Sequence, residues 1–180
     1  TEQWGCPVLR LRSTAQAAGV SNAYRDPKRL GVDRWAALVA ARSLSSKPVV
    51  VIDVGSACTI DVMDGAGRHK GGWIAPGLRL MESALLKGTR EIMLEAGSDD
   101  RAAWGTDTRQ GVRAGIEAAL LGLIERSARR LEEEENEPVE CVMTGGDGQH
   151  LKSLIELPCV YDPALVLKGV ALLVSDERHG

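Results

Sequence analysis

The run Val49–Val54, with the sequence VVVIDV, constrains the fold more than any other segment of the chain. A continuous β-branched run without polar alternation is typical of a strand that is buried on both faces, as in α/β proteins. The three residues that follow, Gly-Ser-Ala, predict a tight turn into a second strand over residues 58–63. We therefore expect a buried strand that carries a carboxylate, Asp53, close to its end.

Strand-like and helix-like segments alternate along the rest of the chain. Short apolar or weakly alternating runs predict further strands over residues 69–74, 140–143 and 159–161, and a short strand over residues 7–11. Apolar residues at helical spacing predict helices over residues 35–44, 78–86, 108–135, 150–155 and 163–174. This alternation around one hairpin predicts an α/β layered fold.

Composition excludes several classes of partner. The 180 residues carry a formal net charge of −3, and aromatic residues make up 3% of them. An acidic chain with few aromatic rings is a poor nucleic-acid binder, because it lacks both a basic surface and stacking platforms. We find no apolar run long enough to cross a membrane and no signal peptide, so we expect no membrane partner and a cytoplasmic location.

Charge is distributed unevenly between the halves of the chain. Basic residues are in excess in the first half, and acidic residues, including a Glu run over residues 132–135, are in excess in the second. Either the first half handles an anion, or the acidic run is simply the solvated end of a helix. The four cysteines, Cys6, Cys58, Cys141 and Cys159, are not spaced as zinc ligands, so we expect reduced thiols.

The first candidate site follows the buried strand. Asp53 can hold a cation that neutralises phosphate charge, and the small residues after it let backbone N–H groups approach phosphate oxygens. Asp61 lies in the next strand, close to the same turn. The alternative is an ordinary β-turn with polar surface residues. The residues of this candidate phosphate loop are Gly55, Ser56, Ala57 and Thr59.

A second candidate lies in the segment GVDR, at residues 31–34. Asp33 is suited to act as general base on a hydroxyl. Arg34 can bind a carboxylate or a phosphate through two donors. The alternative is that Asp33 caps the helix that follows, with Arg34 in solvent.

Two further segments are weaker candidates. Gly145 and Gly146 follow the strand over residues 140–143 and permit close approach to a flat or anionic ligand, although a strand-to-helix turn capped by Asp147 explains them equally well. Thr108 precedes the long predicted helix, where an N-cap is the commonest explanation. The histidines His69, His150 and His179 receive no role, because no triad-like residues surround them in the sequence.

The order of these motifs resembles that of the type III pantothenate kinases and their Bvg-accessory-factor relatives. The resemblance covers residues 22–171 and rests on the segments GVDR, DVGSACT and GGWIAPG, followed by GTDT and TGGD. It implies the actin/Hsp70/sugar-kinase superfold, with two ribonuclease-H-like halves and ATP between them. It also implies transfer of a phosphoryl group from ATP to pantothenate, the first step of coenzyme A biosynthesis, by a homodimer.

The resemblance also assigns residue roles. Asp33 corresponds to the general base, and Tyr24, Gly31 and Arg34 correspond to pantothenate contacts. Thr108 corresponds to a threonine that reaches pantothenate in the partner subunit. Asp53 corresponds to the ligand of a monovalent cation, K⁺ or NH₄⁺, and Mg²⁺ accompanies ATP. The nucleotide contacts implied are Gly55, Ser56, Ala57, Thr59, Gly145 and Gly146.

The N-terminus departs from the family pattern. Family members open with a strand and a DxGNT phosphate loop, and no such motif precedes Tyr24. The chain also does not begin with Met, which agrees with missing upstream sequence. The alternative explanation is that the initiator Met was removed after synthesis. We therefore expect that the N-terminal portion is missing. Residues 1–46 are then the remainder of the first ribonuclease-H-like half, and residues 47–180 are the second half.

Ser56 and Ala23 are milder departures, standing where the family commonly has Thr and Gly. Two other functions stay open from the sequence. One is a regulatory or interaction protein of the Bvg-accessory type, and the other is a kinase of the same superfold that acts on another small hydroxylated acid. The apolar residues of the predicted helix over residues 108–135 fit either a homodimer seam or simple core packing.

Overall fold

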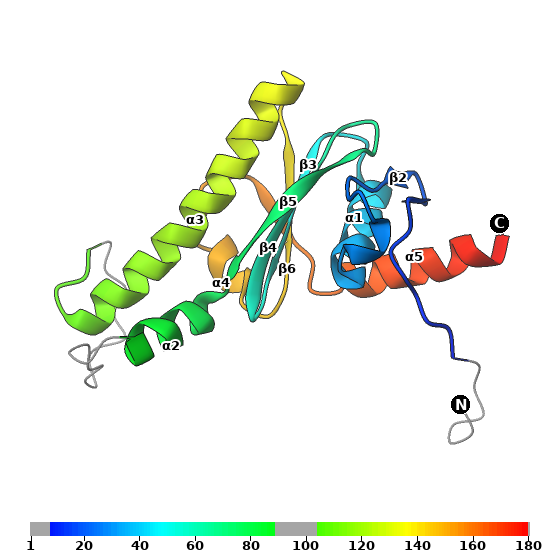
Figure 1. Ribbon diagram of the computed structural model, residues 1–180. Helices are drawn as coiled ribbons and strands as arrows, with labels where there is room; N and C mark the ends of the chain where they lie inside the picture. Colours follow the sequence, from blue (N-terminus) through cyan, green and yellow to red (C-terminus); the bar gives the residue numbers. More distant parts are fainter. Residues whose placement is uncertain (1–7, 89–103, 180) are drawn as a thin grey trace.

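A five-stranded mixed sheet forms the centre of the computed structural model, which describes residues 8–88 and 104–179 (Figure 1). Its strand order is β5-β4-β3-β6-β7. Within this sheet β3, β4 and β5 pair antiparallel, and β6 and β7 continue it parallel to β3. This is the ribonuclease-H-like arrangement that the resemblance implies, so the predicted α/β fold class is confirmed. The strands are β3 (Val49–Val54), β4 (Ala57–Met63), β5 (His69–Pro76), β6 (Glu140–Thr144) and β7 (Cys159–Tyr161).

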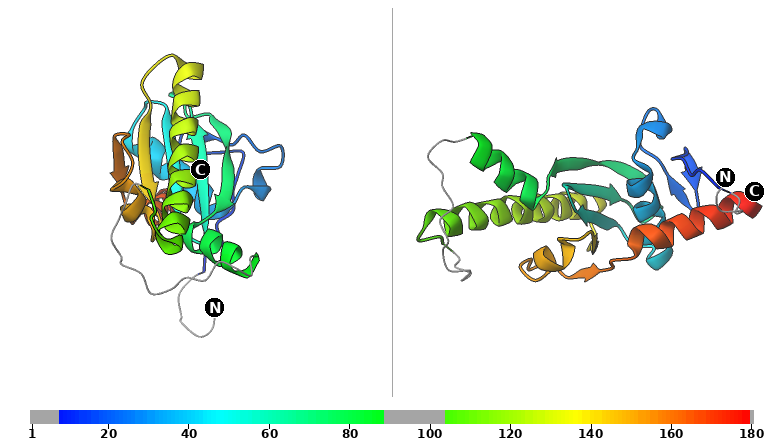
Figure 2. Two further views of the ribbon diagram at one scale, coloured as in Figure 1. Left: turned by 90° about the vertical axis from the view of Figure 1, so that its left-hand side faces the viewer. Right: turned by 90° about the horizontal axis from the view of Figure 1, so that it is seen from below.

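Helices cover both faces of the sheet. Figure 1 shows α3 on one side of the sheet and the pair α1 and α5 on the other, and Figure 2 shows α3 crossing its own face lengthwise. The chain also forms a small hairpin, β1 (Gln16–Ala17) with β2 (Val20–Ser21), and a 3₁₀ turn, η1 (Pro27–Arg29). The helices are α1 (Val32–Leu44), α2 (Leu78–Gly88), α3 (Thr108–Glu135), α4 (Gly148–Lys152) and α5 (Leu165–His179).

The alternation of side chains along β3 divides the core into two clusters. Val50, Ile52 and Val54 face α3 and α4, where they pack with residues such as Leu120 and Ile124. Val49 and Val51 face α1 and α5 and pack around Trp35, which is fully buried. Successive side chains of a strand point to opposite faces. Asp53 is therefore on the same face as Val51, the face covered by α1.

The predicted elements are largely confirmed, with differences in one strand, one hairpin and one short helix. Residues 8–11 lie outside any strand, so the short strand predicted over residues 7–11 is wrong for the part of it that the structure describes. The hairpin β1–β2 was not predicted, because two-residue strands carry no periodic signal. Its turn uses Ala18 and Gly19, both with positive φ. The short helix expected over residues 150–155 runs instead over Gly148–Lys152.

Helix α1 connects the two segments that the sequence assigned to different halves. It lies in the first predicted segment, residues 1–46, and its buried face packs against β3 and α5 of the second. The division at residue 46 stays a prediction. Within the described ranges, no helix combines the length and the apolar character that crossing a membrane requires.

Candidate active site

The α1-covered face of the sheet carries oxygen-bearing side chains at one end of the strands. Asp53 of β3 pairs in register with Thr59 of β4 on one side and with Thr144 of β6 on the other. In-register neighbours project from the same face. Three side-chain oxygens therefore stand in a row across three strands, at the carboxyl ends of the parallel pair. In open α/β sheets this edge is where ligands bind.

Asp53 carries no ion pair or hydrogen bond to another side chain or N–H group in the described part of the protein. Burial raises the pKa of its carboxyl group above the ordinary value, and the negative charge of Asp33 raises it further. The second effect requires that the two carboxylates lie near each other. The structure therefore brings together two of the predicted site residues that are 20 positions apart in the chain.

Asp33 is not the cap of the helix that follows it. Helix α1 begins at Val32, and Gly31 occupies the N-cap position. Asp33 lies in the first turn, where its Oδ1 accepts a hydrogen bond from the backbone N–H of Arg34 at 2.8 Å. A carboxylate in the first turn of a helix is stabilised by the helix dipole. The capping alternative for Asp33 is thus excluded by the helix boundary, and its carboxylate remains available for chemistry.

Arg34 is held by a second carboxylate on the same face of the sheet. Its Nε and Nη2 donate to the two carboxylate oxygens of Asp61, at 2.8 and 2.7 Å. Both side chains are buried, with exposed fractions of 7% and 3%. Burial by itself lowers the pKa of Arg34, but the hydrogen bonds and the charge of Asp61 outweigh it, so the pKa is raised overall. This is a bidentate pair, which fixes the plane of the guanidinium.

Gly72 makes room for this ion pair. It is the in-register neighbour of Asp61 on β5. A Cβ atom at this position would collide with the backbone oxygen of Ile60 and approach the Asp61 carboxylate and Arg34 Nη2. A side chain here would therefore displace the guanidinium. Gly72 thus has a packing reason, whereas its neighbour Gly71 meets no close atom and has a positive φ of 112°.

Tyr24 and His69 complete the surroundings of Arg34. Arg34 Nη1 donates to the Tyr24 hydroxyl at 2.9 Å, and the guanidinium lies over the Tyr24 ring. The His69 ring stacks on Tyr24, with the centroids 6.2 Å apart. Its Nδ1 accepts from the backbone N–H of Ala23, and its Nε2 lies 2.9 Å from Asp61 Oδ1. Because Nδ1 accepts, the hydrogen that faces Asp61 is on Nε2, so His69 donates to Asp61 and orients it.

Two donors of Arg34 remain after these contacts are counted. A guanidinium has five N–H groups, of which two bind Asp61 and one binds Tyr24. One N–H is left on each terminal nitrogen. These two groups suit a single anionic or carbonyl oxygen of a ligand.

Two turns meet beside Asp53. The backbone N–H of Asp147 donates to the carbonyl oxygen of Val54 at 3.0 Å, which ties the turn after β6 to the turn after β3. Gly145 has a φ of 90°, and a Cβ atom there would collide with the backbone of Val54 and approach Asp53 Oδ1. Only glycine fits this close approach. The segments predicted to contact phosphate, residues 55–59 and 145–146, thus lie together around the same carboxylate.

Thr108 lies apart from the other predicted residues. It is the first residue of α3 and is exposed, while Asp107 caps the helix by accepting from the N–H of Gln110 at 2.8 Å. Figure 1 shows this end of α3 beside α2, away from the sheet. Within one chain Thr108 therefore does not join the cluster around Asp33.

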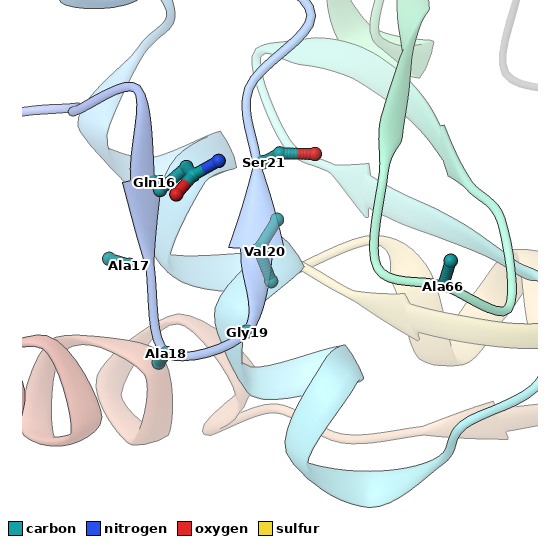
Figure 3. Close-up of a pocket in the computed structure, with 7 residues that line it drawn as sticks. All are labelled: Gln16, Ala17, Ala18, Gly19, Val20, Ser21 and Ala66. Atoms are coloured by element: carbon teal, nitrogen blue, oxygen red, sulfur yellow. The ribbon is translucent and has the colours of Figure 1, made fainter.

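A cavity of about 420 Å³ lies at the β1–β2 hairpin and is not part of this site (Figure 3). It is lined by residues 16–21 and by Ala66 from the β4–β5 turn, and none of these side chains is charged. A second cavity, of about 410 Å³, lies between β4, β5 and the C-terminal half of α3. Neither contains Asp33 or Asp53 among its lining residues.

Sequence reasoning missed two parts of this arrangement. Asp61 was noted only for lying near the turn, and its bond to Arg34, 27 residues away, leaves no local pattern in the sequence. His69 received no role, although the structure places it against Asp61. The alternation of side chains along residues 59–63 places Asp61 on the same face as Thr59 and Met63. This pattern could have assigned Asp61 to the candidate site.

A ribonuclease-H-like fold with carboxylates and glycine turns at the strand ends is the architecture of phosphotransferases of the actin/Hsp70/sugar-kinase superfold. Residues 1–130 match the family model of type III pantothenate kinase. The chain therefore belongs to the type III pantothenate kinase family, a family of phosphotransferases.

Individual relatives agree with this assignment. A type III pantothenate kinase from Alkalilimnicola ehrlichii is 40% identical over 176 residues, which cover 97% of this chain and 70% of the relative. One from Idiomarina loihiensis is also 40% identical, over 96% of this chain and 68% of the relative. A crystal structure described as a conserved putative Baf family transcriptional activator from Campylobacter jejuni superposes with a TM-score of 0.67, at 25% identity, over 89% of this chain and 70% of that one.

Proposed function

We propose that this protein transfers the γ-phosphoryl group of ATP to the hydroxyl of pantothenate, the first step of coenzyme A biosynthesis in the cytoplasm. The observation that carries the proposal is the placement of Asp33 and Arg34, in the first turn of α1, beside the Asp53 strand end. The relatives named above are type III pantothenate kinases, and this placement gives their reaction a base, an anion contact and a phosphate-binding edge. Phosphoryl transfer needs mainly such positioning and charge neutralisation.

Asp33 is the proposed general base. Its Oδ1 is already hydrogen-bonded to the N–H of Arg34, which holds the carboxylate at one orientation in the first turn. Taking the proton from the pantothenate hydroxyl as the new bond to phosphorus forms is the role of a positioned carboxylate. The proton ends on Asp33, and the phosphoryl oxygens receive no proton in this step.

Arg34, Tyr24 and Gly31 are the proposed pantothenate contacts. Arg34 offers the two N–H groups that Asp61 and Tyr24 leave over, and its plane is fixed by the bidentate pair. Preorganised donors lose little conformational entropy when a ligand arrives. Gly31 lies at the N-cap of α1, where a Cβ atom would collide with Asp33 Oδ1, so a larger residue there would displace the proposed base.

Asp53 is the proposed ligand of a monovalent cation, K⁺ or NH₄⁺. The residues present fit such an ion, because an unpaired, half-buried carboxylate and the hydroxyls of Thr59 and Thr144 are hard oxygen donors. No group of three or more His, Cys, Asp or Glu side chains comes together in the described ranges, so these residues bring Asp33 close to Asp53 but add no third ligand of these types. When bound, the cation supplies positive charge next to the phosphates. Mg²⁺ is proposed to arrive with ATP.

The nucleotide is proposed to lie over the two turns beside Asp53. Gly55, Ser56, Ala57 and Thr59 form one side, and the second side is formed by the glycines of the other turn. Backbone N–H groups of such turns bind phosphate oxygens, and the Ser56 hydroxyl preserves the donor that the family commonly supplies with Thr. The residues proposed for the second side are Gly145 and Gly146.

Thr108 is proposed to act on the site of a second chain in a homodimer. Its exposed position at the start of α3, distant from Asp33 of the same chain, is what this role requires. Leu80 of the neighbouring helix α2 is also exposed, at 51%. Sedimentation tests the proposal. A dimer is the expected species, and a monomer across the working concentration range would contradict it.

The proposed reaction is tested by incubating the purified protein with ATP, Mg²⁺ and pantothenate, and by measuring 4′-phosphopantothenate by mass spectrometry. Product is expected in K⁺ or NH₄⁺ buffer and should fall sharply in Na⁺ buffer. A panel of other small hydroxylated acids distinguishes a kinase of another substrate. Absence of turnover with every acid, together with reproducible co-purification of a partner protein, would favour the regulatory alternative.

A further inference from the structure

Two cysteines face each other at the edge of the central sheet. Cys141 lies in β6 and Cys159 in β7, and the parallel register places them directly opposite one another. Their Sγ atoms are 2.7 Å apart, with Cys141 donating to Cys159. Neighbouring strands are about 4.8 Å apart, within the roughly 4.4–6.8 Å that a disulfide requires between Cα atoms. The backbone therefore needs no rearrangement to bond these two sulfur atoms.

The two thiols differ in exposure. Cys141 is 5% exposed and packs in the core cluster that faces α3. Cys159 is half-buried and lies on β7, which is the last strand at its edge of the sheet. An oxidant from solvent therefore reaches Cys159 first. Cys141 is then already in place behind it as the second thiol.

The two thiols also differ in acidity. The hydrogen bond from Cys141 lowers the pKa of Cys159 against the opposing effect of burial, and the positive charge of Lys152 lowers it further. The same hydrogen bond, together with burial, raises the pKa of Cys141. The thiolate is the form of cysteine that attacks a disulfide. The exposed member of the pair is thus also the reactive one.

Cys58 provides a contrast within the same sheet. It is fully buried in β4, and burial, with a smaller contribution from the charge of Asp53, raises its pKa to about 11. It has neither an exposed surface nor a second thiol opposite it in the register. A cysteine of this kind is chemically inert.

We propose that Cys141 and Cys159 are a covalent modification site, at which glutathione disulfide forms a reversible intramolecular disulfide. The Cys159 thiolate attacks one sulfur of glutathione disulfide, which releases one glutathione thiolate and leaves a mixed disulfide. Cys141 then loses its proton and attacks the Cys159 sulfur, which releases the second glutathione. Two protein thiols are oxidised, and one glutathione disulfide is reduced to two glutathione molecules.

The bond would fix the edge strand next to a functional turn. Tyr161, two residues after Cys159, donates its hydroxyl to the carbonyl oxygen of Gly145 at 3.1 Å. Gly145 belongs to the turn beside Asp53. A disulfide between β6 and β7 therefore ties the strand that supports this turn to the strand that leads into it. Closing a loop between residues 18 positions apart also raises the Tm of the oxidised form.

Peptide mapping tests the site without depending on any enzymatic activity. Trypsin cleaves after Lys152, so Cys141 lies on the peptide of residues 131–152 and Cys159 on that of residues 153–168. The folded protein, with Cys6→Ser to remove a thiol outside the described residues, is equilibrated with glutathione disulfide, alkylated and digested without reduction. We expect the two peptides joined, with two hydrogens lost, in a protein that runs as one chain on a non-reducing gel.

Variants separate the two steps of the reaction. Cys141→Ser should retain glutathione on Cys159, because the second thiol is missing, whereas Cys159→Ser should leave Cys141 alkylated. Cys58→Ser is the matched control and should give the same joined peptides as the parent. Recovery of both peptides alkylated would overturn the proposal, and so would stable glutathione on Cys159 of the parent or a link between two chains.

Discussion

The two faces of the central sheet are built from the same strands, but one face is apolar and the other carries polar and charged side chains. Along β3, Ile52 and Val54 point toward α3 into an apolar cluster, whereas Asp53 points toward α1 and lies among hydroxyls and a second carboxylate. The α3 face buries apolar surface and provides stability. The α1 face carries half-buried and buried charges, among them the proposed catalytic and ligand-binding residues. Two adjacent residues of β3 therefore differ in role: Ile52 packs in the core, and Asp53 belongs to the proposed site.

The largest expected effect of a substitution is on the α1 face, at Asp33. Asp33→Asn removes the proposed base and keeps the shape of the side chain, so kcat for pantothenate should fall by about 10²–10⁴-fold, the usual contribution of general base catalysis. Steady-state kinetics measure the change. Asp26→Asn, which alters an exposed cap of the η1 turn, is the matched control and should leave kcat unchanged. A normal kcat for Asp33→Asn would exclude it as the base.

The Arg34–Asp61 pair lies on the same α1 face and should contribute to the stability of the fold. Asp61→Asn leaves a buried guanidinium without its counter-charge, which costs about 3–5 kcal/mol in the free energy of unfolding. Urea denaturation measures the loss. Glu134→Gln, which weakens ion pairs of an exposed carboxylate with Lys70 and Arg130, should cost far less, because solvent screens such pairs. Equal losses in the free energy of unfolding for the two variants would mean that the buried pair stabilises the fold no more than an exposed pair does.

His69 gives a milder test of the same pair. His69→Phe keeps the ring that stacks on Tyr24 but removes the donor to Asp61. Its pantothenate KM should rise by about fivefold, because about 1 kcal/mol of orientation is lost, while its ATP KM should not change. A variant that folds normally and keeps the parent pantothenate KM would contradict the orienting role of His69.

On the α3 face, substitutions should reduce stability and leave substrate recognition intact. Ile124 of α3 is fully buried, and Ile124→Ala should cost about 2–5 kcal/mol in the free energy of unfolding. The pantothenate KM of the folded fraction should match the parent. Leu167→Ala is the control, because Leu167 is 70% exposed on α5. A changed pantothenate KM in Ile124→Ala would show that the two faces are not independent.

The smallest effect concerns pH and Asp53. Because burial and Asp33 raise the pKa of Asp53 in the folded chain, ionising it costs stability, and this cost appears as pH rises through the raised pKa. Asp53→Asn should therefore have a slightly higher Tm than the parent at pH 7, in buffer without K⁺ or NH₄⁺. The difference should vanish below the ordinary value of 3.8. A higher Tm for the parent at pH 7 would contradict the claim that the ionised Asp53 carboxylate destabilises the fold.

The sequence predicted the fold well because the strong signals are periodic and local. The strand Val49–Val54 and the helix Thr108–Glu135 lie where their patterns place them. The predicted residues around Asp53 also come together, because strand ends in a parallel pair share one edge. The Arg34–Asp61 bond and the Cys141–Cys159 register were not predictable, since both depend on which strands and helices become neighbours. The position of Thr108 relative to a second chain is beyond any pattern within one sequence.

The most direct test of the contrast between the faces uses two adjacent residues of β3. For Ile52→Val and Asp53→Asn we would measure kcat/KM for pantothenate in K⁺ buffer, and Tm in buffer without K⁺ or NH₄⁺. Ile52→Val should lose about 0.5–1.5 kcal/mol of stability, a lower Tm by roughly 2–4 °C per kcal/mol, with normal kcat/KM. Asp53→Asn should lose most of its kcat/KM and its response to K⁺, with a Tm at least as high as the parent. The opposite pattern, or full activity in Asp53→Asn, would contradict the assignment of chemistry to the α1 face.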